Sequence, residues 1–301
     1  MVGMNISASF NVKNTIAFSG NNAAQGNYDD GYVHPSPNGP YTSDWGYDNS
    51  SQYLPASHQL LMHQATSFSS TSGLGTSSDS GFKAFAGFDM TYGGNIWDWG
   101  QARIGWEFGF GLLPISISEN LSTTGDVNQN VYAFDTSGID NYAPFPGPGP
   151  HGAGGTGFLP STPTQLPSTQ VPDVTLTCSY KLELMLYTFR LGPSVYWDLS
   201  DDWGLSVGAG PALGLVSGSL KYSEIVGSST TPNTGQIDAT DLVYGGYANA
   251  TLMYHIEEHG DLYLGAQYMS LGNATISGGG QEGRLNLGGQ VYIMAGINWP
   301  F

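Results

Sequence analysis

The chain has 301 residues, 10% of them charged, and a formal net charge of −17 from 24 acidic and seven basic residues. So few basic residues argue against a nucleic-acid partner, because a phosphate backbone needs a basic surface. A soluble domain carries about a quarter of charged residues, and no stretch here approaches the ~18 apolar residues of a membrane-spanning helix. With 44 glycines and 18 tyrosines, this composition favours a membrane protein built from strands.

Eight segments alternate between apolar and polar side chains, the pattern of a strand with one apolar face. In chain order they are residues 4–12, 82–92, 102–110, 187–197, 205–215, 242–254, 262–268 and 285–301. Longer connections at 19–79, 118–173, 223–239 and 277–283 alternate with short turns at 93–100, 199–202 and 255–260. Bacterial barrels show this alternation, with short turns in the periplasm and long loops outside. We expect an all-β, transmembrane, antiparallel up-and-down β-barrel of eight strands, with residues 1–301 as one domain.

Three local patterns qualify this expectation. The segment 61–69 could be a further strand, extending a hairpin above the membrane. The prolines within 118–173 predict irregular structure, because proline cannot donate to a strand ladder. Apolar residues at 182, 184 and 186 fall out of phase with 187–197. We expect a β-bulge there, or a projection of this part beyond the membrane.

The closing segment carries the clearest alternation. One phase of residues 285–301 is continuously apolar and consists of Leu285, Leu287, Val291, Ile293, Ala295, Ile297, Trp299 and Phe301. This predicts a single strand across a bilayer, with lipid on the apolar side.

Two further sets of residues each fall at a particular place on the predicted strands. The first set is aromatic and falls at the short-turn end of the strands: Trp97, Trp99, Trp197, Trp203, Tyr254, Trp299 and Phe301. Because aromatic rings prefer the headgroup level, we expect a periplasmic girdle. The second set is charged and lies on the non-apolar strand faces: Lys83, Asp89, Arg103, Glu107 and Arg190. We expect Asp89 and Glu107 to pair with the basic residues inside a plugged lumen, since an unpaired buried ion is costly.

The sequences LYTFRLGPSVYWDLSDDWGLSVGAGPALG (186–214) and LNLGGQVYIMAGINWPF (285–301) resemble small bacterial outer-membrane β-barrels of the OmpA transmembrane-domain and OmpX type. The resemblance implies an outer-membrane location, with the lipid bilayer and lipopolysaccharide as partners. It also implies that the barrel assembly machinery reads Phe301, and that a signal peptide was removed ahead of Met1.

Motifs for metals and nucleotides are weak. His255 to His259 match the H-x-x-E-H zinc pattern, which requires a helix, but fall in a turn between strands. Asp126, Asn128 and Asn130 resemble the start of a calcium loop but lack its glycine and its bidentate glutamate. We therefore expect no metal, no cofactor and no catalytic residue, and the lone Cys178 allows no internal disulfide.

Two further groups have alternative interpretations. Acidic residues of the first loop could form a looser cation site or make ordinary turns: Asp29, Asp30, Asp44 and Asp48. The glycines at 208, 210 and 214 fit small lumen-facing residues on a strand better than a nucleotide loop.

The first long loop is rich in aromatic residues. These could form an adaptable contact surface or pack the loop on itself, which we favour: Tyr28, Tyr32, Tyr41, Trp45, Tyr47 and Tyr53. We expect a non-enzymatic protein whose surface loops serve envelope integrity, adhesion or binding of an extracellular ligand. The alternatives are a porin-like channel, a lipid A-modifying enzyme using His63 with Ser67 or Ser69, and a soluble lipocalin-like barrel.

Overall fold

The structure, a computed structural model, describes residues 1–12, 15–17, 23–70, 77–79, 83–139, 159–227, 232–256 and 260–298. Trp299, Phe301 and residues 140–158 of the second expected loop lie outside these ranges. In the described part the regular structure is β, apart from three short 3-10 helices: η1 (Ala23–Gln25), η2 (Ser50–Gln52) and η3 (Pro55–Ser57). The expected all-β class is confirmed. No helix in these ranges is long and apolar enough to cross a membrane.

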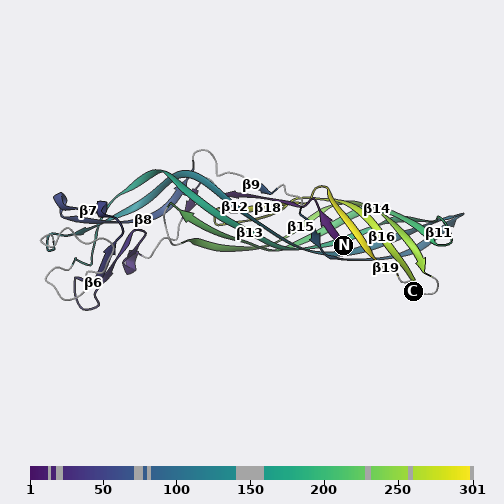
Figure 1. Cartoon of the computed structure of the whole chain (residues 1–301), viewed down its shortest axis with the longest axis horizontal. Helices are drawn as coiled ribbons and strands as arrows, with labels where there is room; N and C mark the ends of the chain where they lie inside the picture. The colour runs from purple at the N-terminus through teal and green to yellow at the C-terminus, as the bar shows by residue number, and fades with distance from the viewer. Residues whose placement is uncertain are drawn as a thin grey trace.

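Seven strands form an elongated, curled antiparallel wall (Figure 1). They are β11 (Phe88–Trp99), β12 (Ala102–Asp135), β13 (Thr164–Asp198), β14 (Trp203–Val226), β15 (Asn233–Ile256), β16 (Gly260–Leu271) and β19 (Gln290–Asn298). Within this wall β12 and β13 have 34 and 35 residues. The expected irregular connection at 118–173 is therefore wrong for most of the residues described, which continue as paired strands.

Two prolines of this region lie at irregularities of the strand pairing, where the ladder does not require a backbone N–H. The β12–β13 register passes from Gly125↔Val174 to Val127↔Val171, and from Gln129↔Thr169 to Val131↔Leu166. Pro172 and Pro167 lie among the extra residues of these two irregularities. A proline without an N–H is tolerated at a bulge, so the strand passes through both. The bulge expected near residue 186 is absent, because the β12–β13 register is continuous from Val174 to Trp197.

The largest sheet does not confirm a closed barrel of eight strands. Its ordered path has ten strands and two free ends: β10-β1-β19-β16-β15-β14-β13-β12-β8-β3. The added members are β1 (Val2–Met4), β3 (Thr15–Ala17), β8 (Gln59–Ser69) and β10 (Phe85–Ala86), with β7 (Tyr53–Leu54) beside β8. Strand β8 pairs with residues 126–135 of β12, beyond the reach of β11. The strand expected at 61–69 is thus confirmed.

The two terminal segments are each broken by a turn. Leu285 and Leu287 are buried, whereas Val291 and Ile293 on β19 are exposed. A turn at 288–289, with φ of 90° at Gly289, separates them and reverses the phase. The single strand expected over 285–301 is therefore wrong.

The first expected strand, 4–12, also divides, at Asn5 with φ of 62°. Ile6, Ala8 and Phe10 then point inward and are buried rather than facing lipid. The inner pieces form a second sheet in the order β17-β18-β2-β9: β17 (Ala274–Gly278), β18 (Gln281–Asn286), β2 (Ser7–Val12) and β9 (Ser77–Asp79).

The far end of the molecule carries a small folded unit, here called the distal cap (residues 23–62). It contains a three-stranded sheet of β4 (Asn27–Tyr28), β5 (Gly31–Pro35) and β6 (Thr42–Tyr47). Tyr28, Trp45 and Tyr47 are buried in a separate hydrophobic core with Leu60 and Phe134. The first loop thus packs on itself, as favoured, although Tyr41 is exposed. Figure 1 places β6 and β7 at the opposite end from β11 and the C-terminus.

Candidate functional site

The inner and outer faces of β12 exchange character partway along the strand. Up to Leu112 its outward residues are apolar, including Trp106 and Phe108, while the inward positions are charged or glycine. Beyond Leu112 the outward residues are mainly serine and asparagine, while inward Leu113 and Ile115 are buried. One strand therefore meets two environments.

The same reversal occurs at Tyr187 on β13, Leu215 on β14 and Leu242 on β15. The register pairs Leu112 with Tyr187, Tyr187 with Leu215, and Leu215 with Leu242. These four residues, here called the reversal level, therefore lie side by side across four strands. The out-of-phase leucines upstream of residue 187 belong to the part beyond this level, which was one of the two expected explanations.

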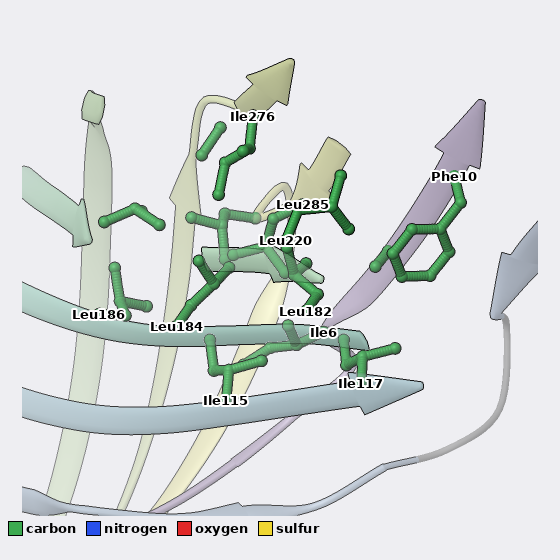
Figure 2. Packing of buried hydrophobic residues seen from close by; sticks show 14 of the residues in the cluster. Ile6, Phe10, Ile115, Ile117, Leu182, Leu184, Leu186, Leu220, Ile276 and Leu285 are labelled. Carbon is green, nitrogen blue, oxygen red and sulfur yellow. The ribbon is translucent and has the colours of Figure 1, made fainter. Parts of the chain in front are cut away.

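Beyond the reversal level the inner face holds a hydrophobic core of the kind found in water-soluble proteins. Figure 2 shows Ile115, Ile117, Leu182, Leu184 and Leu186 from β12 and β13 packing beneath residues of β2, β17 and β18. We call this part, from the reversal level to the distal cap, the extension. Below it the wall is apolar outside and polar inside, as in a barrel surrounded by lipid.

Aromatic residues mark the short-turn end of the apolar wall. Trp97, Trp99, Trp203 and Tyr254 are exposed there, and the rings of Trp203 and Tyr254 are 5.0 Å apart. Trp197 is partly exposed and pairs with Ala102, the register partner of Trp99.

A second aromatic group, near the reversal level, was missed in the sequence. Tyr187, Tyr244 and Tyr268 point outward there, and Tyr244 is 77% exposed. The signal was available, since each is among the last apolar residues before the outward phase turns polar. Tyrosines at both ends of an apolar band are typical of membrane interfaces.

The structure brings together two of the five expected lumen charges. Arg190 on β13 donates to both carboxylate oxygens of Asp89 on β11, at 2.8 and 3.0 Å, and to Thr91. A Cβ at Gly109 would collide with this guanidinium, so glycine makes room for it. Arg103 instead pairs with Asp198 at the exposed rim, 2.8 Å away. Lys83 precedes β10 and is half-buried.

Glu107 does not form the ion pair with a basic residue that the sequence predicts. It faces no arginine or lysine at ion-pairing distance among the described residues, and accepts a hydrogen bond from Asn249 Nδ2 at 2.7 Å. Strand pairing places Glu107 between Gly93 of β11 and Gly192 of β13, four residues along β12 from Arg103 at the rim.

A cavity of about 750 Å³ occupies the lumen between Glu107 and the short-turn rim. Near its mouth His255 Nδ1 lies 2.7 Å from Asp261, and His255 Nε2 lies 2.8 Å from the Tyr196 hydroxyl. The Arg103 guanidinium stacks on the Tyr196 ring at 4.4 Å. Both nitrogens of His255 are thus engaged by protein groups. Residues 257–259 of the zinc-like motif lie outside the described residues.

The remaining candidates have structural partners. Asp29 and Asp30 accept hydrogen bonds from the backbone of Ala65 and His63 and so tie the cap to β8. Asp44 pairs with His34 at 2.8 Å, and Asp48 donates its backbone N–H to Gln52. No group of three metal-ligating side chains occurs in the described ranges.

The residues that resembled a calcium loop, Asp126, Asn128 and Asn130, lie on β12 and hydrogen-bond to neighbouring strands. Gly208 and Gly214 lie inward on β14 and are buried, as expected of small lumen residues.

The proposed lipid A pair does not form. His63 and Ser67 lie four residues apart on β8, which separates them by roughly 13 Å in an extended strand. His63 Nδ1 contacts Asp30 at 2.5 Å, and Asn128 donates to Ser67. Both residues pair with β12 far beyond the reversal level.

Two buried groups dominate the electrostatics of the extension. Burial raises the pKa of Glu224, although Asn233 and Gln281 donate hydrogen bonds to it. Burial also raises the pKa of Cys178 to about 12. On the outer surface, hydrogen bonds from Lys181 and Lys221 lower the pKa of Glu183 to about 2.

No protein-family model and no curated protein matches the chain. Among solved structures it is similar to the outer membrane protease OmpT from Escherichia coli, with 10% identity, a TM-score of 0.32, and coverage of 100% of this chain and 96% of that one. A Pseudomonas aeruginosa FadL homologue has 9% identity, a TM-score of 0.16, and coverage of 99% and 90%.

Neither structure is of the OmpA or OmpX kind, so the comparisons do not confirm that resemblance. The expected absence of enzymatic activity is contradicted by the first comparison, a protease, and is not retained. Similarity at this level assigns no activity to the chain.

Proposed function

We propose that the chain is an outer-membrane β-barrel whose strands continue outside the bilayer as a rigid stalk that presents the distal cap for binding or adhesion. The observation that carries this is the reversal level, at which four paired strands exchange an apolar outer face for an apolar core. Lipid around the wall below the reversal level accounts for its apolar outer face. Water around the extension accounts for its polar outer face and its apolar core.

The pairing around β1 supports a closed wall of eight strands in the membrane part. Strand β1 pairs with β19 on one side and β10 on the other. Gly87 joins β10 to β11, and its N–H donates to Met1 O at 2.8 Å. The proposal therefore counts β10 and β11 as one strand and closes the ring in the order β1, β10 with β11, β12, β13, β14, β15, β16 and β19.

The length of β12 supports the stalk. From Leu112 to Asp135 the strand travels about 75 Å at roughly 3.3 Å per residue. The cap, with its own hydrophobic core, would lie well clear of the lipid headgroups. Such a position favours contact with large partners outside the cell.

The filled extension argues against a porin-like channel. Leu113, Leu186, Val216 and Met269 point inward beyond the lumen cavity, and each is at most 1% exposed. A solute entering from the short-turn side would meet this core.

Single cysteines on the outer face of β12 test the proposal. Cys178 is buried and its pKa is raised, so the unaltered chain provides an unreactive background. In intact cells, a membrane-impermeant maleimide should label Ser118→Cys and spare Phe108→Cys. Both should react after denaturation. Equal labelling of the two variants in intact cells would contradict the proposal.

A further inference from the structure

Glu107, in the lumen, has no ion-pair partner among the described residues. Arg190 pairs with Asp89, and Arg103 pairs with Asp198. The carboxylate of Glu107, whose residue is only 6% exposed, has no such partner in the part of the chain that the structure describes. A buried carboxylate without an ion-pair partner is costly, so a cation from outside would stabilise it.

The surroundings of Glu107 are shaped to hold it in place. Asn249 donates to Glu107 Oε1 at 2.7 Å and accepts from the Gly208 N–H at 2.8 Å, which fixes the amide orientation. A Cβ at Gly208 would lie 2.5 Å from the Glu107 carboxyl group, so only glycine leaves this space. Tyr247 on β15 interacts with Glu107, and the Arg190 guanidinium lies 5.7 Å from the centre of the Tyr247 ring.

Glu107 lines the cavity of about 750 Å³, which is far larger than a single ion. Its walls include the rings of Tyr196 and Tyr263 and the side chains of Met253 and Met294. Arg103 already covers one face of Tyr196, so Tyr263 is the ring available to an ammonium group, and thioethers pack well against alkyl chains. The cavity thus combines the Glu107 carboxylate, which has no ion-pair partner among the described residues, with surfaces suited to a short hydrocarbon; Asp89, Arg103 and Asp261 also line it.

We infer that this cavity binds a small organic ammonium ion, with the ammonium group at Glu107 and the alkyl part along Met253 and Met294. The ligand enters from the short-turn rim, where Arg103 and Asn298 are exposed. The proposed function decides only whether the short-turn rim faces the periplasm; the site itself does not depend on it. The site goes beyond the role proposed for the distal cap.

Butylammonium chloride is a suitable probe. Its binding to the full chain in lipid nanodiscs can be titrated by saturation-transfer difference NMR. Glu107→Gln keeps the side-chain size and an acceptor for Asn249 but removes the charge, and should weaken binding at least about tenfold. Asp238→Asn, which removes an exposed charge on the outer face of β15, should bind like the unaltered chain.

A comparison of ligands on the unaltered chain needs no variant to fold. Butanol, which has no charge, should bind at least about tenfold more weakly than butylammonium, and equimolar sodium chloride should not displace butylammonium. Absence of butylammonium binding, equal binding of butanol, displacement by sodium, or unchanged affinity of folded Glu107→Gln would overturn the inference. Cysteine labelling on β12 reports membrane insertion separately, so the two proposals can fail independently.

Discussion

An arginine placed on the outer wall should report directly which part of the protein faces lipid. Leu191 on β13 is 55% exposed and pairs with Phe108, between the reversal level and the short-turn aromatics. Arginine near the midplane of a lipid-facing barrel costs about 2–4 kcal/mol. Leu191→Arg should therefore lower the equilibrium constant for folding roughly 30- to 900-fold.

The matched control is Thr177→Arg on the same strand and outward face, beyond the reversal level. Thr177 is exposed, and a surface substitution in water changes stability by at most about 0.5 kcal/mol. Both variants can be unfolded reversibly with denaturant in phosphatidylcholine vesicles and followed by tryptophan fluorescence. Equal losses of unfolding free energy for the two variants, or no loss for Leu191→Arg, would refute the assignment of the reversal level to the membrane surface.

Four further predictions follow from named contacts. Because burial raises the pKa of Cys178 to about 12, the folded protein should resist maleimide at pH 8 and react once denatured; rapid labelling of the folded chain would be inconsistent with this burial. Asp89→Asn should cost about 3–5 kcal/mol of stability, because it leaves Arg190 buried without its partner, and Asp89→Asn with Arg190→Gln should recover part of this loss in the same unfolding assay. The raised folded-state pKa of Glu224 means that its contribution to stability is fully present below the unfolded pKa of about 4.3 and declines as pH rises through the folded pKa. The unfolding free energy of the unaltered chain should thus fall more between pH 5 and pH 8 than that of Glu224→Gln, and parallel pH curves would contradict this. Planar bilayers containing the protein should show no steady single-channel conductance, since the core above the lumen cavity is closed, and a stable conductance would reinstate the channel.

The lipid-facing phases were predictable because they depend on local alternation. Trp106 and Phe108 on β12, like Phe189 and Leu191 on β13, point outward as expected. A period of two on one strand needs no knowledge of its neighbours. The prediction failed at Leu285 and Val291, which share a phase in the sequence but face opposite ways, because an intervening turn shifts the count by one residue.

The candidate site was only half predictable for a related reason. Sequence phase placed Glu107, Asp89 and Arg190 on the inner face, but which of them meet depends on residues far apart in the chain. Arg190 and Asp89 are 101 positions apart, and Glu107 and Asn249 are 142 apart. Barrel stagger sets these meetings, and no local pattern encodes it.

The amino-acid sequence by itself determined the all-β class, the apolar outer face of the wall and the aromatic residues at the short-turn end, because each arises from side chains that alternate within one segment. The tertiary structure decided how far β12 and β13 continue beyond the apolar wall and at which level the apolar side chains change from the outer to the inner face. It also decided that Glu107 has no ion-pair partner among the described residues. Those outcomes depend on which strands become neighbours, so they emerge only when distant segments are brought into register.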